Sequence, residues 1–360
     1  MLLTSVSLRS FRCFDSLDLP LEAGLNLLAG PNGVGKTTVL EAIYVALTGT
    51  PLRHGGPTFL VACGKHSASV VLRFTTEARE AERSYQRSLI ARCAPNRVSS
   101  LLDSVPLSRT ELETLRPPLC VFTPARAEIV RGSPGFRRSH FDALLSALNP
   151  SYAQLIRRYG ICLQQRTAAL STAPDRHLDA WDEQLAALAH EIHTHRSQLV
   201  QRLVPFLERR AHALGLTGVY ISYRPHGPVA SADDCLDALR AARSSDRLNR
   251  RTSVGPHRSD FAFELAGLPA RTAASQGQQR LIAIALLLAE GDLLAASRGR
   301  APLFLFDDAL SELDPHSAEL VLTQLSTTHQ SLLTATHAPP VQQHSSTTLI
   351  DLAPLNDPVH

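Results

Sequence analysis

The sequence predicts an α/β protein with a long helical segment inserted into it. Short apolar runs typical of strands occupy residues 2–8 and 25–29, and similar runs return at 219–223 and 303–306. Between the two groups of runs, residues 139–214 repeat apolar side chains at helical spacing. Strands that alternate with helices indicate a mixed α/β core, so we interpret the helical stretch as an insertion into that core.

The expected domain boundaries follow the same patterns. Residues 1–124 and 206–360 should form the core, and residues 125–205 should form the inserted helical lobe. Three strand-like pieces between residues 67 and 107 predict a small antiparallel sheet within the first core segment. A chain of 360 residues is long enough for two or three domains.

Composition favours a globular protein of a reducing compartment. Apolar residues make up 44% of the chain, and the formal net charge is only +3. The six cysteines are dispersed and form no C-x-x-C pair, so we expect buried free thiols rather than disulfides or a zinc site. No signal peptide or membrane-spanning run is evident in the sequence, and we expect a cytoplasmic protein.

A glycine-rich loop carries the clearest chemical signal. It lies between the apolar run at 25–29 and a helical pattern at 38–47, and it reads Gly30-Pro31-Asn32-Gly33-Val34-Gly35-Lys36-Thr37, with Thr38 next. In this strand–loop–helix context the spacing G-x-x-x-x-G-K-T is that of a phosphate-binding loop, or P-loop. Backbone amides and the helix N-terminus would surround the phosphates, while Lys36 would reach the terminal phosphates and Thr37 would coordinate Mg²⁺. The loop therefore predicts a nucleoside triphosphate site.

A second helix start also suits an anion. The segment Ser275-Gln276-Gly277-Gln278 opens an apolar helix that extends to about Leu294. A serine at the N-cap and free backbone amides in the first turn can hold a negatively charged group. Taken alone, the segment is more simply interpreted as an ordinary helix cap.

A pair of carboxylates supplies the third signal. The apolar run at 303–306 ends in Asp307-Asp308, and Ser311-Glu312-Leu313-Asp314 follows. Asp307 is placed to hold Mg²⁺ through water, and Asp308 to orient or deprotonate an attacking water. A further strand-like run at 332–335 leads to His337, a candidate contact for the γ-phosphate.

The order of these motifs resembles that of ABC-type ATPases. The P-loop, Ser-x-Gly-Gln, the aspartate pair, Ser-x-Leu-Asp and a final histidine are more specific together than separately. The resemblance implies an ATPase head in which Ser275, Gly277 and Gln278 of one subunit contact the ATP held by the P-loop of another. It therefore implies ATP-driven homodimerisation, with ATP and Mg²⁺ as cofactors.

Within that superfamily the chain resembles the RecF family of bacterial recombination mediators over nearly its full length. Besides the P-loop and the Asp307-Asp308 block, the residues that carry this resemblance are Ser10 to Phe14, Phe122-Thr123-Pro124, Gly132-Ser133-Pro134 with Arg137-Arg138, and Gly255-Pro256-His257-Arg258. The resemblance implies that Arg12 contacts ATP. It also implies sequence-independent DNA binding at gaps and stalled forks and weak, DNA-stimulated ATP hydrolysis. The partners it implies are RecO and RecR, with which the protein would help load RecA during repair and SOS induction.

Two other functions remain open. A nucleotide-binding subunit of an ABC transporter would share the motifs, although such subunits usually carry Glu in place of Asp308. A non-hydrolysing, ATP-gated DNA scaffold would differ only in the fate of ATP. Stimulation of phosphate release by DNA would separate the RecF-like activity from both.

Contacts to DNA are the least explicit feature of the sequence. No helix-turn-helix, zinc-finger or RNP motif is evident, so contact with backbone phosphates is the expected mode. Four arginine pairs are candidates: Arg137-Arg138, Arg157-Arg158, Arg209-Arg210 and Arg250-Arg251. For any single pair, a solvated helix face is the simpler interpretation.

Overall fold

The structure, a computed structural model, divides into two compact units. Unit 1 comprises Met1–Pro124 and Gly299–His360, and unit 2 comprises Ala125–Arg298. The predicted end of the inserted lobe, residue 205, lies inside one continuous helix, and unit 2 continues to Arg298. The residues that the structure describes are 1–53, 56–78, 81–172, 174–336 and 347–353.

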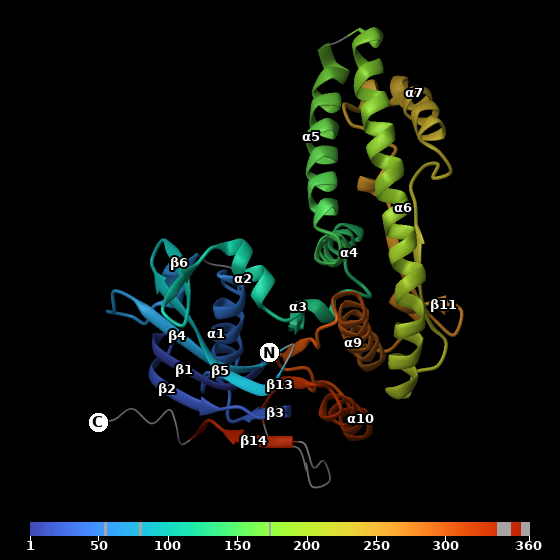
Figure 1. Cartoon of the computed structure of the whole chain (residues 1–360). Coiled ribbons are helices and arrows are strands. Elements are labelled where there is room, and N and C mark those ends of the chain that lie inside the picture. The colour runs from blue at the N-terminus through green and yellow to red at the C-terminus, as the bar shows by residue number, and fades with distance from the viewer. Residues whose placement is uncertain (54–55, 79–80, 173, 337–346, 354–360) are drawn as a thin grey trace. The chain divides into compact units, whose positions relative to one another are not determined.

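Unit 1 consists of two sheets with a long helix between them (Figure 1). Its strands are β1 (Leu2–Phe11), β2 (Phe14–Pro20), β3 (Gly24–Ala29), β4 (Ala68–Ala78), β5 (Ala81–Ala94), β6 (Arg97–Leu102), β7 (Val105–Leu107), β8 (Leu119–Phe122), β12 (Leu303–Phe306), β13 (Gln330–Ala335) and β14 (Thr347–Asp351). Its helices are α1 (Lys36–Thr48), the short 3₁₀ helix η1 (Pro57–Leu60), α2 (Arg109–Leu115) and α10 (Pro315–Ser326). The sequence patterns did not indicate α2, α10 or β14.

The parallel sheet of unit 1 brings the chemical motifs together. Its five strands lie in the order β14-β3-β13-β12-β8. Strands β3 and β12 pair with opposite sides of β13, and all three run parallel. Because the carboxyl ends of parallel strands meet at one edge of a sheet, the loop after β3 and the aspartates after β12 emerge at the same edge.

The antiparallel sheet of unit 1 is larger than predicted. The strand-like pieces between residues 67 and 107 form β4 to β7, and β1 and β2 extend the same sheet to six strands. Strand β1 pairs with β2 on one side and with β4 on the other. A period-2 pattern shows which face of a strand is buried, but it does not show which distant strand supplies the hydrogen-bond partners.

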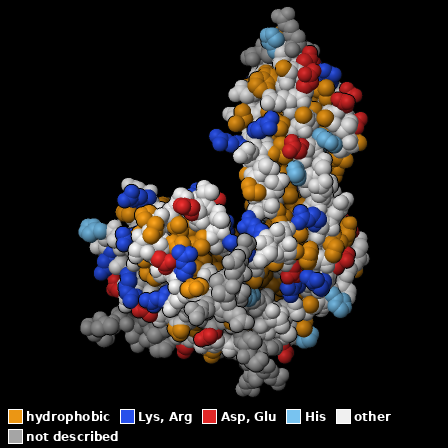
Figure 2. All heavy atoms as spheres, in the orientation of Figure 1, with side chains coloured by type: hydrophobic (Ala, Val, Ile, Leu, Met, Phe, Trp, Pro, Cys, Tyr) orange, Lys and Arg blue, Asp and Glu red, His pale blue; other side chains and the backbone are white. Residues whose placement is uncertain are grey.

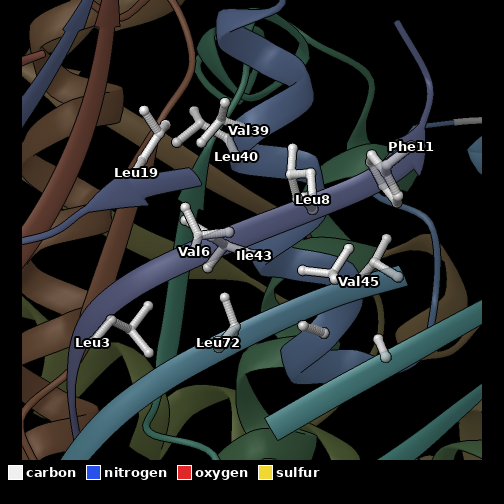
Figure 3. Close-up of a cluster of buried hydrophobic side chains, with 14 of the residues drawn as sticks. Leu3, Val6, Leu8, Phe11, Leu19, Val39, Leu40, Ile43, Val45 and Leu72 are labelled. Atoms are coloured by element: carbon white, nitrogen blue, oxygen red, sulfur yellow. The ribbon is translucent and has the colours of Figure 1, made fainter. Parts of the chain in front are cut away.

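Helix α1 is buried between the two sheets. It is apolar around most of its circumference, as expected for a helix that is covered on several sides. Val39 and Ile43 of α1 belong to one cluster of buried side chains with Val6 of β1 and Leu72 of β4 (Figure 3). Leu305 of β12, in the parallel sheet, belongs to the same cluster. This packing fixes the start of α1, and with it the glycine-rich loop, against both sheets.

Unit 2 consists of packed helices and one small sheet. Its elements are α3 (Pro124–Ala127, beginning at the junction), α4 (Pro134–Leu148), α5 (Pro150–Thr172), α6 (Asp175–Ala213), β9 (Val219–Arg224), α7 (Ala232–Asn249), the 3₁₀ helix η2 (Pro256–Arg258), β10 (Asp260–Leu265), β11 (Leu268–Pro269), α8 (Ala270–Ala273) and α9 (Gln276–Arg298). Helices α5 and α6 lie side by side, and α7 packs against α6 (Figure 1). Among the described residues, no helix has the length and apolar character needed to cross a bilayer.

A buried arginine links three of these helices. Arg166 of α5 is fully buried, and its guanidinium pairs with Asp182 of α6 at 2.5 Å and with Asp246 of α7 at 2.7 Å. Loss of one partner would leave an uncompensated buried charge, so the arrangement strongly favours one packing of the three helices.

The strands of unit 2 do not join either sheet of unit 1. We expected the strand at 219–223 to resume the core fold, but β9 pairs with β10, and β10 pairs with β11, in a separate three-stranded antiparallel sheet. Phe261 of β10 packs against Phe141 of α4 with ring centroids 4.2 Å apart and the ring planes tilted by 35°. The apolar face of this small sheet is thus covered by helices of its own unit, which explains why unit 2 extends to Arg298.

Candidate active site

A cleft at the carboxyl edge of the parallel sheet contains most of the predicted site residues. Its volume is about 720 Å³. The predicted residues that line it are Arg12, Asn32, Gly33, Gly35, Lys36, Thr37, Thr38, Asp307 and Asp308. The whole lining belongs to unit 1, so the P-loop and the aspartate pair, which are far apart in sequence, form one site.

The glycines of the loop are required by its backbone. Gly35 has a φ of 99°, and a Cβ at this position would lie 2.4 Å from the ring of Phe14. Gly30 has a φ of 147°, and a Cβ there would lie 3.1 Å from Val34. Gly35 is also the N-cap of α1 and offers no side-chain bond to the helix, so the first amides of α1 are left for another acceptor.

Lys36 closes the loop on itself in this structure. Its ammonium donates to the carbonyl oxygens of Gly30 at 2.6 Å and Pro31 at 2.9 Å. Partial burial lowers the pKa of Lys36, and the negative charges of Asp308 and Asp307 oppose that shift. The ammonium thus contacts the loop carbonyls and feels the charge of the carboxylates, and phosphate oxygens can replace its carbonyl contacts.

The oxygens beside Thr37 fit a magnesium ion. The Thr37 hydroxyl donates to Oδ1 of Asp307 at 2.7 Å. Hydroxyl and carboxylate oxygens are ligands that Mg²⁺ prefers, and the ion usually takes one or two carboxylates and completes its shell with phosphates and water. A Thr37–Asp307 pair at the mouth of a phosphate loop is such a donor set.

The hydroxyl of Thr334 connects the two aspartates. It donates to Oδ1 of Asp307 at 3.1 Å and accepts the backbone N–H of Asp308 at 2.8 Å. Thr334 lies on β13, between the strands that carry the P-loop and the aspartates, and it is buried. Thr334 could not be predicted as a site residue, because nothing in its local pattern distinguishes it from any threonine in a buried strand.

The chain turns sharply after Asp307. Asp308 has a φ of 52° and Glu312 a φ of 68°, which is unusual for residues with a side chain. Ser311 donates to the carbonyl oxygen of Asp308 at 3.0 Å. Asp314 then caps α10 by accepting the N–H of Ser317 at 3.0 Å, and the bonds from Ser317 lower the pKa of Asp314. The predicted Ser-x-Leu-Asp motif therefore forms a compact turn between the aspartate pair and α10.

Arg12 forms a wall of the cleft. Its guanidinium makes two hydrogen bonds, of 2.8 and 2.7 Å, to the fully buried carboxylate of Glu41 on α1. This ion pair attaches the turn between β1 and β2 to the helix that follows the P-loop. Cys13, the next residue, also lines the cleft and is exposed, as is Cys63, so the expectation that all cysteines are buried is wrong for these two.

Three further lining residues carry chemistry that the sequence analysis did not assign. Arg53 and Phe59 are exposed side chains from the segment after α1, and Thr336 follows β13. Arg53 and Phe59 could not be predicted, because the composition of a connecting segment does not reveal which of its side chains face a cleft.

The Ser275 segment lies in unit 2 and starts α9 with reciprocal capping. The Ser275 hydroxyl accepts the N–H of Gln278 at 3.2 Å, and the Gln278 side chain accepts the N–H of Ser275 at 2.9 Å. The buried amide of Gln279 donates to the carbonyl oxygen of Ala274 at 2.9 Å and so holds the preceding loop against the helix. Ser275, Gly277 and Gln278 thus form a well-ordered helix start. His337 lies outside the described residues.

Comparison with known proteins identifies the family. The family described as RecF/RecN/SMC N terminal domain matches residues 2–353. Similar proteins include the DNA replication and repair protein RecF of Xanthomonas euvesicatoria pv. vesicatoria, 34% identical over 93% of this chain and 92% of that protein. The DNA replication and repair protein RecF of Gloeobacter violaceus is 33% identical over 94% of this chain and 92% of that protein. The chain belongs to the RecF family.

Solved structures agree with that assignment. The recombination mediator protein RecF-ATP in the RecFOR pathway superposes with a TM-score of 0.75 at 25% identity, covering 95% of this chain and 93% of that one. An SMC head bound to the C-winged helix domain of ScpA matches with a TM-score of 0.57 at 15% identity, over 94% and 90% of the two chains, which shows the fold alone. The fold is therefore that of a RecF/SMC-type ATPase head.

Proposed function

We propose that this protein is an ATP-dependent DNA-binding ATPase of recombinational repair that dimerises when it binds ATP. The observation that carries the proposal is the convergence of the P-loop, Thr37 and Asp307-Asp308 in one cleft of a RecF-family chain. By analogy with the RecFOR pathway named for a similar structure, RecO and RecR are the proposed partners. Loading of RecA at gapped DNA and a role in SOS induction belong to the same proposal.

Each cleft residue has a proposed part in binding or hydrolysis. Residues Gly30 to Thr38 surround the phosphates, and Lys36 exchanges its loop carbonyls for phosphate oxygens. Thr37 and Asp307 hold Mg²⁺, which neutralises charge on the phosphates when it is bound. Asp308 orients the attacking water, and Arg12 adds positive charge to the cleft wall. The proposed contact of His337 is the γ-phosphate.

A second copy of the chain completes the site in this proposal. Ser275, Gly277 and Gln278 of that copy would contact the ATP held by the P-loop. The first amides of α9 are the proposed donors, since a helix N-terminus attracts the terminal phosphate. ATP would then act as part of the interface, which makes dimerisation depend on the nucleotide.

The four arginine pairs proposed as DNA contacts differ in what they bind within unit 2. Arg137 is buried and makes two hydrogen bonds to Asp260, so it serves the fold. Arg209 and Arg210 both pair with Asp292. The pairs Arg157-Arg158 and Arg250-Arg251 are exposed and, within the part of the chain that the structure describes, make no side-chain ion pair. These two pairs are the better candidates for phosphate contacts.

Phosphate release with and without gapped duplex DNA tests the function. We expect slow release that DNA accelerates, and Lys36→Met should lose nucleotide binding. Asp308→Asn should bind ATP but release phosphate at least about 100-fold more slowly, the usual contribution of a group that handles the attacking water. DNA-independent release would favour a transporter-type subunit. Binding without any release would favour the ATP-gated scaffold.

A further inference from the structure

Helix α5 exposes a face that differs from those of the neighbouring long helices. Its 23 residues include no Asp or Glu, whereas α6 and α7 carry several. Exposed side chains recur along α5 at helical spacing. They include Gln154, Arg157, Arg158, Ile161, Gln164 and Gln165. We call these residues, with the exposed Gly160, the α5 face. All of its polar side chains donate hydrogen bonds, and none is negatively charged.

The two arginines of this face form no ion pair with an acidic side chain among the described residues. Within the described chain, neither Arg157 nor Arg158 makes an ion pair or a side-chain hydrogen bond. Arg240 of α7 provides a contrast, because it is 43% exposed yet lies 3.9 Å from Asp179 and 3.7 Å from Glu183. The charges of the α5 face are therefore available to an external anion. Figure 2 shows positively charged side chains on the edge of unit 2 that α5 forms.

Gly160 lies inside this helix, at a position where no contact with the described residues requires a glycine. Glycine destabilises a helix interior relative to alanine, so such a residue usually has a steric reason. Here a Cβ would meet nothing within 4 Å. The next residue, Ile161, is 52% exposed although it is strongly apolar. A small residue beside an exposed apolar one permits an external backbone to approach the helix closely.

We propose that the α5 face binds the sugar–phosphate backbone of DNA. Arg157 and Arg158 would pair with phosphates, and the glutamine amides would donate to further phosphate oxygens. Gly160 would allow the strand to approach, with Ile161 against a deoxyribose. From Gln154 to Gln165 the helix rises about 16 Å, the axial length of about five phosphates of one strand. This inference rests on the proposed DNA-binding function and names its surface.

A salt titration of DNA binding tests the arginines. The full-length protein, with a slowly hydrolysed ATP analogue and Mg²⁺, is titrated against a fluorescein-labelled gapped duplex. The double variant Arg157→Gln/Arg158→Gln should bind at least about tenfold more weakly at moderate salt, and its log–log salt slope should fall by about 2. Arg240→Gln removes one charge from the same unit and should change affinity less than about twofold. An unchanged affinity and slope in the double variant would overturn the proposal and favour an acidic protein as the occupant.

Gly160→Ala supplies a second, independent measurement. Because the added methyl has free space, this variant should raise the midpoint of thermal unfolding by a few degrees, about what a Gly→Ala change in a helix produces. The same variant should bind the DNA probe several-fold more weakly. A stabilised protein with unaltered DNA affinity would overturn the close approach at Gly160. Failure of the wild-type protein to bind DNA would instead reject the proposed function.

Discussion

At the scale of single residues, the two aspartates of the cleft share one partner, the hydroxyl of Thr334, which contacts them at different atoms. The carboxylate of Asp307 receives hydrogen bonds from Thr37 and Thr334, whereas Asp308 is fixed through its backbone N–H, which Thr334 accepts. Thr334 can serve both because a hydroxyl donates one hydrogen bond and accepts others. A buried hydroxyl from a neighbouring strand therefore helps to fix the relative position of the two aspartates.

Replacement of Thr334 tests this dependence. Thr334→Val keeps the shape of the side chain but leaves the Asp308 N–H without its acceptor and removes one of the two hydrogen bonds to Oδ1 of Asp307, a loss of about 1–3 kcal/mol. We expect nucleotide affinity in the presence of Mg²⁺ to fall by about 5- to 150-fold, the equivalent of that energy, with a smaller change when Mg²⁺ is chelated. Isothermal titration with and without EDTA measures both values.

Two further substitutions distinguish positioning from a general loss of stability. Thr334→Ser restores the hydroxyl and should recover most of the Mg²⁺-dependent affinity. Thr336→Val changes another threonine of the same cleft, whose side chain makes no hydrogen bond to any residue that the structure describes, and should leave the affinity nearly unchanged. Equal losses in Thr334→Ser and Thr334→Val would show that the hydroxyl does not position the aspartates.

At the scale of elements, helix α6 is attached to the small sheet of unit 2 by a neutral histidine. His193 of α6 shares a 2.6 Å hydrogen bond with the hydroxyl of Tyr223 on β9. Burial, together with smaller contributions from the charges of Arg196, His190 and His226, lowers the pKa of His193 to about 4. The packing of α6 against β9 thus favours the uncharged imidazole.

This shift predicts that unit 2 is sensitive to acid. The pKa of His193 is lower in the folded chain than its ordinary value of 6.5, so below pH 6.5 the unfolded chain binds the proton more tightly. The stabilisation is complete above pH 6.5 and is lost as the pH falls toward 4. A shift of this size corresponds to about 3 kcal/mol at pH 4.

Urea unfolding between pH 7.5 and 4 measures the effect. His193→Gln retains an acceptor for Tyr223 but cannot be charged, so its stability should decline less steeply with acid than that of the wild type. His212→Gln, which removes an exposed histidine from the same helix, is the control and should follow the wild-type curve. Parallel curves for wild type and His193→Gln would contradict the assignment.

At the scale of the whole molecule, the two groups of residues proposed to contact one ATP belong to different units of the chain. The P-loop cleft belongs to unit 1, and the start of α9 belongs to unit 2. In the proposed dimer, unit 2 of one copy contacts the nucleotide held by unit 1 of the other. Nucleotide binding and assembly should therefore respond differently to changes at the two places.

Ser275→Arg tests assembly without altering the P-loop. We expect sedimentation velocity to show monomers without nucleotide and dimers with ATP and Mg²⁺. An arginine at the start of α9 places a long cation beside the partial positive charge of the helix N-terminus, so dimers should be lost while ATP binding stays within about twofold. Ser297→Arg, at the exposed opposite end of α9, should still dimerise. Dimers of the Ser275→Arg protein, or dimers without ATP, would contradict the proposed assembly.

The sequence alone was sufficient for features that depend on neighbouring residues. The strand–loop–helix around Lys36, the buried strand before Asp307 and the helix start at Ser275 were all predicted and are present. Each depends on spacing within about ten residues, because glycines, caps and apolar periods act locally. The order of these motifs was also enough for the RecF-like fold, which the comparisons bear out.

Only the tertiary structure decided which distant groups meet. It placed β9 and β10 in a separate sheet, brought Thr334 to the aspartates, and paired Arg137 with Asp260 while leaving Arg157 exposed. In each case a local pattern left the partner open, since a strand can pair with several edges and an arginine can face several acids. The choice is made by packing between segments that lie far apart in sequence, where buried polar groups must find partners and apolar faces must be covered.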